Sequence, residues 1–344
     1  MVEKIDSTKN IIPLIILNWN GEYDTIECLK SIKKSDNNRF LPVVIDNGSK
    51  VDSLDILKKN CSQLFENILY TTKEKLNNSH NLVIDLVSSS NLKEALIFIE
   101  NNENLGFAKG NNIGIKIAKM LDTDWVMLLN NDTEIRYDAL TALNKFINAN
   151  NEIAAITPQI RLFKDKDKIW NCGGRLTFFG SRKYFYAEEN IDKVPGKGYS
   201  FITFITGCAL VFQYKKTGIL TEDFFFGEED YEFSLRLKKN NLNMVCLYDS
   251  IIYHKVGSTI KKSNNIISTI YLYYINRLIN TRNYYSDFRW QITRFLSYLY
   301  LPILLKKNNI NPLKSYSLIN DINKYIAINK TVSDIEFHKA MIKC

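Results

Sequence analysis

Short β-branched runs alternate with longer helical segments through the first 130 residues, and this alternation restricts the fold more than any other feature. The order strand, helix, strand at this spacing predicts parallel βαβ units. Several runs are apolar at nearly every position, as expected when helices cover both faces of a sheet. We therefore expect an α/β fold with a mixed, mainly parallel sheet flanked by helices. The predicted strands are 11–17, 41–45, 95–100 and 125–129, and the predicted helices are 25–34, 53–65 and 111–121.

The pattern changes after Asp132, where shorter apolar runs predict a mixed or antiparallel half. The polar, Asn- and Ser-rich stretch 72–93 interrupts the first half, and we interpret it as an insertion. From residue 266 onward the spacing is helical, with a break near 308–312. The predicted elements of the second half are helices 137–149 and 230–240, strands 153–160, 168–172 and 201–212, and a strand pair within 244–253.

The positive charge of the chain is concentrated toward its C-terminus. Residues 255–344 contain 14 Lys or Arg and 4 Asp or Glu, whereas residues 1–254 are close to neutral. A nucleic-acid-binding protein usually carries a basic stripe on its folded domain, so we expect no nucleic-acid partner. The basic, aromatic-rich segment 271–307 suits peripheral contact with an anionic membrane, and it equally suits a solvated or packed helical tail. We expect two regions, 1–259 and a helical region 260–344.

Cysteine usage and hydropathy bear on the compartment. The six cysteines form no CxxC pair that could hold zinc or run redox chemistry, so we interpret them as reduced thiols. No uninterrupted apolar run reaches 18 residues, and the first ten residues mix acidic and basic side chains where a signal peptide would be apolar. We expect a cytoplasmic protein, with any peripheral contact on the cytoplasmic membrane face.

Two acidic residues follow apolar strands of the predicted sheet. Asp46 ends the run that begins at 41, and Asp132 comes just after strand 125–129. Ligands of doubly wound folds bind beyond the carboxyl ends of strands. A carboxylate there can face a base, a ribose or a cation that also binds phosphates. The structural alternatives are an Asx-turn at Asp46 and a helix cap at Asp132.

A glycine-containing segment at 104–114 opens a predicted helix. Gly106, Gly110 and Gly114 are four residues apart, and they match neither the GxGxxG pattern of dinucleotide binding nor a P-loop. The spacing still allows an anion near the helix N-terminus. Close packing of the helix on the sheet explains Gly110 and Gly114 equally well.

Four acids follow three phenylalanines where the helix near residue 230 begins. Acids in a first turn favour the helix dipole, yet apolar neighbours such as 224–226 can raise the pKa of Asp230 and make it a better base. Glu232 and Arg236 are spaced for an ion pair. His254 is the sole histidine near these segments, and no GxSxG or reactive-cysteine pattern accompanies it, which disfavours triad hydrolysis.

Taken in order, these segments resemble family 2 glycosyltransferases, and most closely their rhamnosyltransferase-like branch. The match covers about residues 11–259, and its specificity lies in the order of the segments. The resemblance implies a GT-A nucleotide-sugar-binding domain over 1–259, followed by the helical extension 260–344. The segments are IILNWN at 15–20, the Asp46 turn, NLGFAKGNN at 104–112, LLNND at 128–132, TGCALVF at 206–212, EEDYEFSLR at 228–236 and His254.

The resemblance also implies roles for the matching residues. Asp230 would be the catalytic base, with Glu229 as the fallback. Residues 130–132 stand where the family has its DxD element, which would place Asp132 on Mg²⁺ or Mn²⁺ and His254 beside the metal or the diphosphate. Because Asn130 replaces the first acid of that element, we expect weak metal binding. The implied donor-binding residues are Asn18, Asp46, Asn104, Gly106, Asn111, Asn130 and Asn131, with Asp46 on the nucleobase.

The implied activity is inverting, metal-dependent transfer of rhamnose or a similar sugar. The donor would be a dTDP- or UDP-linked sugar, and the acceptor a hydroxyl group of a glycan or lipid-linked molecule in cell-surface polysaccharide synthesis. Two other classes remain open. A nucleotidyltransferase or NAD-dependent oxidoreductase could use a related sheet, although the absent GxGxxG and P-loop patterns count against it. A non-catalytic, tail-anchored scaffold is disfavoured by the acids at 46, 132 and 230.

Overall fold

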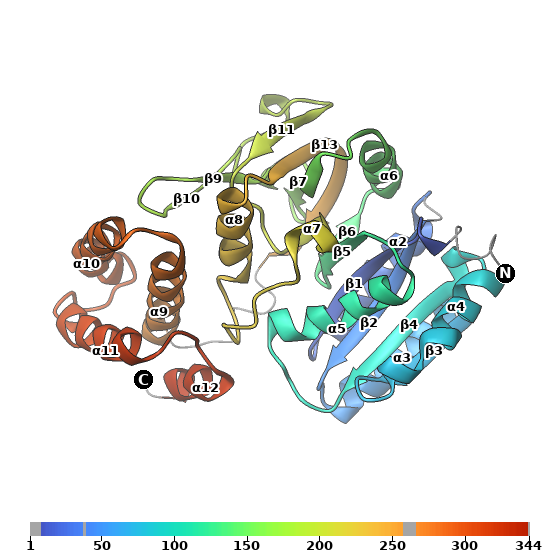
Figure 1. Cartoon of the computed structure of the whole chain (residues 1–344), viewed down its shortest axis with the longest axis horizontal. Coiled ribbons are helices and arrows are strands. Elements are labelled where there is room, and N and C mark those ends of the chain that lie inside the picture. Colours follow the sequence, from blue (N-terminus) through green and yellow to red (C-terminus); the bar gives the residue numbers. More distant parts are fainter. Residues whose placement is uncertain (1–7, 37–38, 257–265, 343–344) are drawn as a thin grey trace.

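A mixed sheet forms the centre of the computed structural model, which describes residues 8–36, 39–256 and 266–342. Within these residues the sheet has 11 strands in the order β11-β13-β7-β12-β5-β1-β2-β4-β3, with β6 on β13 and β8 on β7 (Figure 1). A separate hairpin pairs β9 with β10. The strands are β1 Ile12–Asn18, β2 Phe40–Asn47, β3 Asn67–Thr72, β4 Ala95–Asn101, β5 Trp125–Asn130, β6 Thr133–Ile135, β7 Ile153–Leu162, β8 Ile169–Asn171, β9 Gly174–Leu176, β10 Arg182–Tyr184, β11 Tyr199–Ile202, β12 Ala209–Gln213 and β13 Asn243–His254.

Helices surround the sheet and form a separate layer at the C-terminal end of the chain (Figure 1). Three short 3₁₀ turns lie at Leu76–Asn78, Leu92–Glu94 and Ile191–Lys193. The α-helices are α2 Glu22–Lys34, α3 Val51–Leu64, α4 His80–Ser89, α5 Phe107–Met120, α6 Ala139–Ala149, α7 Tyr214–Thr217, α8 Glu229–Lys239, α9 Ile266–Tyr284, α10 Asp287–Lys307, α11 Lys314–Ile328 and α12 Asp334–Ile342.

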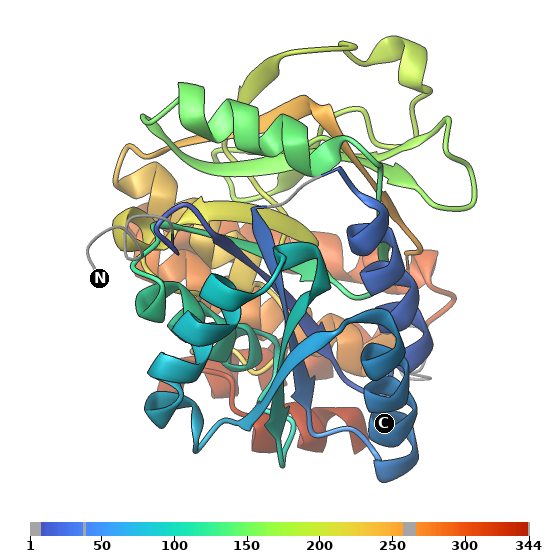
Figure 2. The ribbon, with the colours of Figure 1, turned by 90° about the vertical axis from the view of Figure 1, so that its right-hand side faces the viewer.

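The N-terminal half of the sheet is parallel, which confirms the prediction from the alternating elements. β1 pairs with β2 and β5, β2 pairs with β4, and β4 pairs with β3, all in parallel. Residues of α4 and α5 pack on one face, and residues of α2 and α3 pack on the other (Figure 2). These parallel strands therefore end at one edge of the sheet, where doubly wound folds bind ligands.

The stretch 72–93 contains helix α4 and continues the alternation of strands and helices, whereas its interpretation as an insertion stays a prediction. Strand β3 precedes it and pairs in parallel with β4, so α4 belongs to an ordinary crossover between two parallel strands. β3 escaped prediction because it is an edge strand whose residues are mostly half-buried, without a continuous apolar run.

Two strand predictions in the second half are wrong in detail. The run 201–212 divides into β11 and β12, which lie at different places in the sheet. The predicted strand pair within 244–253 is the single strand β13, parallel to β7, with a register shift between Leu247 and Ile251. Asp249 and Ser250 lie inside this irregularity, and their polarity resembles that of a turn.

The C-terminal helices α9–α12 enclose a hydrophobic cluster of their own, which confirms the predicted helical extension. Phe224 and Tyr231, from the segment around the start of α8, belong to the same cluster, so this layer is joined to the sheet domain. Within α8, Glu232 and Arg236 form the predicted ion pair at 3.0 Å. The boundary expected at 259/260 lies outside the described residues.

Two simpler expectations concern cysteines and membrane spans. The five described cysteines are free and buried, as the sequence predicts for reduced thiols. Across the described ranges, none of the helices combines the length and the apolar character needed to cross a bilayer.

Helix α5 packs closely on β1 and β2 at the positions of its glycines. It begins at Phe107, before the predicted start at 111, because Gly106 caps it. A Cβ added to Gly114 would lie 2.8 Å from two side-chain atoms of Ile15, and one on Gly110 would collide with Leu17. The packing interpretation of these two glycines is confirmed.

We predict that Gly114→Ala destabilises the protein by about 1 kcal/mol. Alanine gains about 1 kcal/mol of helix propensity over glycine, but crowding a packed core costs about 1–3 kcal/mol. Urea unfolding measures the difference. The exposed Lys119→Ala on the same helix is the control and should change stability by less than about 0.5 kcal/mol. Equal stability of Gly114→Ala and wild type would contradict the packing argument.

Candidate functional site

Polar side chains gather where β1, β2, β4 and β5 end. The register places Asn18 of β1 beside Asp46 of β2, and Asn47 of β2 beside Asn101 of β4. β5 pairs with the other side of β1 and ends at Asn130. We call these five residues the polar edge. The parallel topology brings them together although they are far apart in the sequence.

Both carboxylate oxygens of Asp46 accept hydrogen bonds. The Asn18 side chain donates to Oδ1 at 2.8 Å, and the backbone N–H of Ser49 donates to Oδ2 at 3.0 Å. Asn18 is fully buried, and its own Oδ1 accepts from the Thr25 hydroxyl at 2.8 Å. Asp46 thus closes the turn after β2 through Ser49, three residues on, where an Asx-turn would use the N–H two residues on, and Asn18 supports this turn. The nucleobase role of Asp46 and the donor role of Asn18 stay predictions.

Sequence reasoning missed Asn47, which holds the loop after β4. Its Nδ2 donates to Asn104 Oδ1 at 2.8 Å and to the Gly106 carbonyl at 3.2 Å. Its Oδ1 accepts from Asn101 Nδ2 and from the Leu105 N–H, both at 3.2 Å. A buried amide at the last position of an apolar strand was the signal that could have found it.

The loop before α5 packs against the segment before α8. Gly106 has a φ of 80°, and a Cβ there would collide with the carbonyl of Phe225, so this position requires glycine. The N–H of Phe107 donates to the same carbonyl at 3.2 Å. The Asn111 side chain donates to the Phe107 carbonyl at 2.9 Å, back into its own helix. The structure thus joins Asn104 and Gly106 to the segment that carries the predicted base.

Asp132 and His254 form a buried pair at the same edge. His254 ends β13, and its Nε2 lies 3.1 Å from Oδ1 of Asp132. The Trp170 ring packs edge-on against the imidazole, with 4.5 Å between centroids. Burial alone would lower the pKa of His254, but Cys208 and Asp132 outweigh burial and raise the pKa to about 10. At neutral pH the ring therefore retains a proton that a cation bound at Nδ1 would have to displace.

This pair fits a weak site for a divalent cation. The Nδ1 atom of His254 is buried without a hydrogen-bond partner among the described residues, and Asp132 contributes a carboxylate. No group of three or more His, Cys, Asp or Glu that could hold a metal occurs in the part of the chain that the structure describes. Mg²⁺ in nucleotide enzymes is commonly held by one or two carboxylates plus substrate phosphates, so a donor would have to complete the ligands.

Asn130 and Asn131 fasten the end of β5 to two different neighbours. The backbone N–H of Asn130 donates to the Cys208 carbonyl at 2.8 Å, which ties β5 to the loop 206–208. The Asn131 side chain donates to the Thr25 hydroxyl at 3.1 Å and to the Gly21 carbonyl at 3.3 Å. Asn131 therefore holds the start of α2, whereas the Asn130 side chain is half-buried at the edge.

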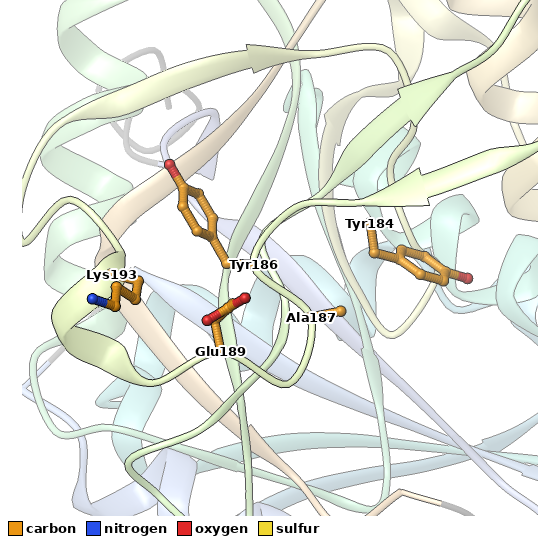
Figure 3. Close-up of a pocket in the computed structure, with 5 residues that line it drawn as sticks. All are labelled: Tyr184, Tyr186, Ala187, Glu189 and Lys193. Atoms are coloured by element: carbon orange, nitrogen blue, oxygen red, sulfur yellow. The ribbon is translucent and has the colours of Figure 1, made fainter.

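An open hollow of about 520 Å³ lies beside the loop that follows β10 (Figure 3). None of the predicted site residues lines it. Tyr184 connects it to β10, the strand that also carries Arg182. The lining residues are Tyr184, Tyr186, Ala187, Glu189 and Lys193.

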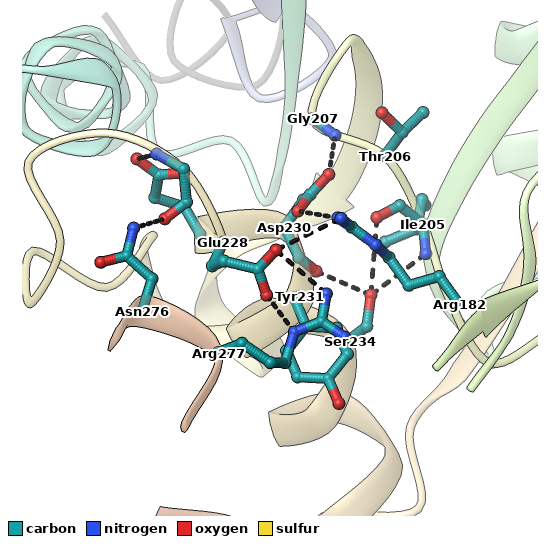
Figure 4. Close-up of polar contacts among 12 residues, drawn as sticks. Arg182, Ile205, Thr206, Gly207, Glu228, Asp230, Tyr231, Ser234, Asn276 and Arg277 are labelled. Atoms are coloured by element: carbon teal, nitrogen blue, oxygen red, sulfur yellow. Dashed lines mark hydrogen bonds and ion pairs between the residues drawn. The ribbon is translucent and has the colours of Figure 1, made fainter. Parts of the chain in front are cut away.

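A group of acids and arginines, with Glu228 and Arg277 buried and Arg182 and Asp230 partly exposed, surrounds the N-terminus of α8 (Figure 4). Oε1 of Glu228 lies 3.0 Å from Nη2 of Arg277 on α9 and 3.3 Å from Nη2 of Arg182 on β10. Arg182 also lies 3.8 Å from Oδ1 of Asp230. Burial would raise the pKa of Glu228, but the two guanidinium groups outweigh burial and hold this pKa below its usual value. We call these four residues the carboxylate–arginine network.

Sequence reasoning missed Arg182 and Arg277. One belongs to the hairpin β9–β10 and the other to the C-terminal helices, so neither lies near α8 in the sequence. No spacing rule connects them to Glu228, because only the tertiary fold brings these three elements together.

Helix α9 also fixes the turn that precedes α8. Glu228 has a φ of 74°, in the left-handed region that residues other than glycine rarely adopt. The Asn276 side chain donates to the carbonyls of Phe226 at 3.0 Å and Gly227 at 3.1 Å, and the Asn280 side chain donates to the Glu228 carbonyl at 3.1 Å. The C-terminal region is therefore part of the candidate site.

The two candidate bases differ in their surroundings. Burial raises the pKa of Glu229 to about 8, and its Oε1 accepts from the Gly227 N–H at 2.9 Å. Burial also raises the pKa of Asp230, although Arg182 opposes the rise. The Asp230 side chain keeps 23% of its surface exposed, whereas Glu229 is buried. Asp230 is thus the carboxylate that a ligand can reach.

The phenylalanines before α8 face the C-terminal helices. Phe224 lies in the cluster that α9–α12 enclose, and the rings of Phe225 and Phe226 contact Phe337 of α12 at centroid distances of 5.1 and 6.0 Å. The described polar partners of the Asp230 carboxylate are Arg182 and the Gly207 N–H.

The loop 206–208 connects the two halves of the site. The Gly207 N–H donates to Oδ2 of Asp230 at 3.4 Å, and the next carbonyl, of Cys208, accepts from Asn130. A Cβ on Gly207 would lie 3.4 Å from the Phe107 ring and 3.8 Å from Cβ of Asp230. The end of β5, the start of α5 and the start of α8 therefore meet around this loop.

Comparisons with known proteins agree with this arrangement. Residues 77–211 match the family model described as glycosyl transferase family 2. The low-salt glycan biosynthesis hexosyltransferase Agl10 of Haloferax volcanii is 26% identical over 218 residues, which cover 60% of this chain and 68% of that protein.

Solved structures share the fold. GalNAc-T7, crystallised with UDP, GalNAc and Mn²⁺, superposes with a TM-score of 0.57 at 14% identity, over 96% of this chain and 56% of that chain. The 1–349 fragment of S. aureus TarS in complex with UDP-GlcNAc superposes with a TM-score of 0.51 at 13% identity, over 96% of this chain and 81% of that chain. The chain thus spans little more than half of the GalNAc-T7 chain. The similarity confirms the expected GT-A arrangement of the sheet and its helices.

We predict that Arg277→Met lowers the free energy of unfolding by about 3 kcal/mol at neutral pH, because it leaves a buried carboxylate with only one guanidinium group. Since the pKa of Glu228 is lowered in the folded protein, the pair stabilises at neutral pH, and this stabilisation is lost as the pH falls through that pKa. Urea unfolding of Arg277→Met, Glu228→Gln and the double variant measures the coupling.

The double variant should recover at least half of the loss, because it removes the unpaired charge as well. Arg294→Met is the control: this arginine stacks on Trp290 at 4.8 Å and is half-buried, so its loss should cost about 1 kcal/mol or less. Strictly additive effects of Arg277→Met and Glu228→Gln would contradict the ion-pair argument.

Proposed function

We propose that this chain is a family 2 glycosyltransferase, which transfers a sugar from a nucleoside diphosphate donor to a hydroxyl group of an acceptor. The observation that carries the proposal is the meeting of three acids around one sheet edge. Asp46 lies near the end of β2 and Asp132 follows β5, the two parallel strands that flank β1, and Asp230 reaches the same edge through the loop 206–208. Asp46 could bind the nucleoside, Asp132 could hold a cation on the diphosphate, and Asp230 could accept the proton of the acceptor hydroxyl.

The donor would bind along the polar edge. Asn18 and Ser49 hold the Asp46 carboxylate in place, so it could accept a hydrogen bond from a ribose or a base without reorganising. Asn104 and Gly106 line the start of α5, where helix N–H groups favour a diphosphate. A hexose such as rhamnose, carried by dTDP or UDP, is the donor that we propose. Agl10, a hexosyltransferase of glycan biosynthesis, is the relative that supports a hexose.

Asp132 and His254 would hold a divalent cation together with the donor phosphates. Such an ion would supply positive charge that stabilises the departing diphosphate. The GalNAc-T7 structure contains both UDP and Mn²⁺, which supports Mn²⁺ or Mg²⁺ as the ion. Because only one carboxylate is contributed, we expect the chain to need the nucleotide in order to hold the ion.

We predict that a nucleoside diphosphate sugar and Mn²⁺ or Mg²⁺ raise the melting temperature together more than either does alone. The measurement is a thermal-shift panel of dTDP-, UDP- and GDP-sugars with and without EDTA, and with NADH for the oxidoreductase alternative. Asp132→Asn should abolish the metal-dependent part of the shift. Asp124→Asn, an exposed acid before β5, is the matched control and should keep it.

Two outcomes would count against this reading. If a nucleotide sugar raises the melting temperature of Asp132→Asn in EDTA as much as it raises that of the wild type with metal, the metal role of Asp132 is excluded. A shift with NADH and none with any nucleotide sugar would favour the oxidoreductase class.

Asp230 would act as the base of an inverting displacement. As the acceptor oxygen bonds to the anomeric carbon and the bond to the diphosphate breaks, the hydroxyl proton passes to the Asp230 carboxylate. Glu229, the fallback, is a weaker candidate: with a pKa of about 8 it is largely protonated at neutral pH, and it is buried. Arg182 would hold Asp230 in place, and its positive charge opposes the rise that burial causes in the pKa of Asp230.

We predict that Asp230→Asn lowers turnover at least about 100-fold while donor affinity stays within a few-fold, because general base catalysis contributes about 10² to 10⁴ in rate. The assay is release of nucleoside diphosphate from the donor found in the panel, with thermal shift for affinity. Glu229→Gln is the control and should retain most turnover. Normal turnover of Asp230→Asn with an inactive Glu229→Gln would move the base to Glu229. A product that retains the donor's anomeric configuration would exclude single displacement.

A further inference from the structure

One face of α10 is apolar and exposed to solvent. Phe288, Phe295, Leu299 and Ile303 keep 77, 61, 56 and 52% of their surfaces exposed. Their spacing of seven, four and four residues places them on one side of the helix. Scattered exposed apolar residues are ordinary, but a continuous stripe of them marks an interaction surface.

The opposite face of α10 is already packed. Trp290, Leu301 and Leu305 are buried in the cluster enclosed by the C-terminal helices, and the Trp290 indole N–H donates to the Leu278 carbonyl of α9 at 2.9 Å. The exposed stripe therefore belongs to a docked helix, whose orientation on the molecule is fixed.

The tip of the hairpin β9–β10 extends this surface. Phe178 and Phe179 keep 65 and 43% of their surfaces exposed. Arg289, in the first turn of α10, donates from Nε to the Phe178 carbonyl at 2.8 Å, and its guanidinium group lies 4.5 Å from the Phe178 ring. We call Phe178, Phe179 and the four residues of the α10 stripe the aromatic face.

Cations accompany this face. Helix α10 carries Arg289, Arg294, Lys306 and Lys307 against the single acid Asp287. The Nζ atom of Lys307 lies 5.7 Å from the ring of Tyr300, an exposed residue next to the stripe. Exposed aromatic and aliphatic side chains flanked by Lys and Arg are the composition of helices that lie in the interface of an anionic membrane.

We infer that the aromatic face docks on an anionic lipid bilayer, with the aromatic side chains in the interface and the lysines over the lipid phosphates. Charge complementarity selects this occupant, because residues 255–344 hold 14 basic and 4 acidic residues. A second copy of the same basic chain would bring like charges together, which disfavours it as the occupant.

The same hairpin links the aromatic face to the carboxylate–arginine network. The Gly180 carbonyl, next to the tip, accepts from Nη1 of Arg277 at 2.6 Å and from the Tyr231 hydroxyl at 2.9 Å. Two residues further on, Arg182 reaches Asp230. Docking at the tip would thus place a membrane near the acceptor side of the site. A lipid-linked acceptor would follow from this position, and that consequence alone rests on the proposed function.

Flotation with vesicles tests the docking without any activity assay. The full chain is mixed at low salt with vesicles of phosphatidylglycerol and phosphatidylcholine, or of phosphatidylcholine alone. We expect flotation with the anionic vesicles only, and its loss at high salt. Phe295→Ser/Leu299→Ser and Phe178→Ser/Phe179→Ser should each lower the bound fraction about tenfold. Lys306→Gln/Lys307→Gln should lower it by a similar factor.

Tyr23→Ser/Tyr137→Ser removes two exposed aromatics elsewhere on the surface and should float like the wild type. The docking is overturned if folded wild type stays unbound at low salt, or if the variants of the aromatic face float unchanged. It is also overturned if light scattering shows a concentration-dependent dimer that Phe295→Ser/Leu299→Ser breaks while no form floats. Donor-induced thermal shifts report separately on the proposed function, so either conclusion can fail alone.

Discussion

The buried ion pair between Glu228 and Arg277 is the interaction on which the candidate site depends. It joins the start of α8 to α9, and it lies where the backbone takes a left-handed turn that Asn276 and Asn280 also hold. Replacing such a pair with apolar groups can be neutral for stability, whereas removing one partner is costly. We infer that the pair specifies one position for the acids of α8. The free-energy cost of burying its two charges is offset by burial of the surrounding aromatic cluster.

A second constraint comes from the parallel half of the sheet. Its strands end at one edge, and each ends in a polar residue whose hydrogen bonds support the next: Asn18 holds Asp46, and Asn47 holds the loop that contains Asn104. Unpaired buried polar groups are costly, and these hydrogen bonds hold Asp46 and the loop in place before any ligand arrives. The loop 206–208 then brings Asp230 to that edge from the mixed half of the sheet. Donor and acceptor functions would thus come from two differently built halves.

The C-terminal helices take part in two tasks through different faces. Arg277, Asn276 and Asn280 face the turn before α8, whereas α10 presents its aromatic face to solvent. The hairpin β9–β10 touches both, because Gly180 accepts from Arg277 and Phe178 accepts from Arg289. This region, which composition alone describes as a basic tail, is physically continuous with the site.

The sequence by itself determined the α/β class, the parallel order of the first strands, the helical end and the acids at the sheet edge. These features follow from the local periodicity of apolar residues and from the positions of strand ends, and both can be recognised from residues adjacent in the sequence. It misjudged β3, which as an edge strand lacks an apolar run, and β13, whose irregularity resembles a turn. Only the tertiary structure decided that Arg182 and Arg277 meet Glu228 and that Glu229 is buried while Asp230 stays accessible. Contacts between distant segments, and the burial that shifts a pKa, exist only once the chain has folded.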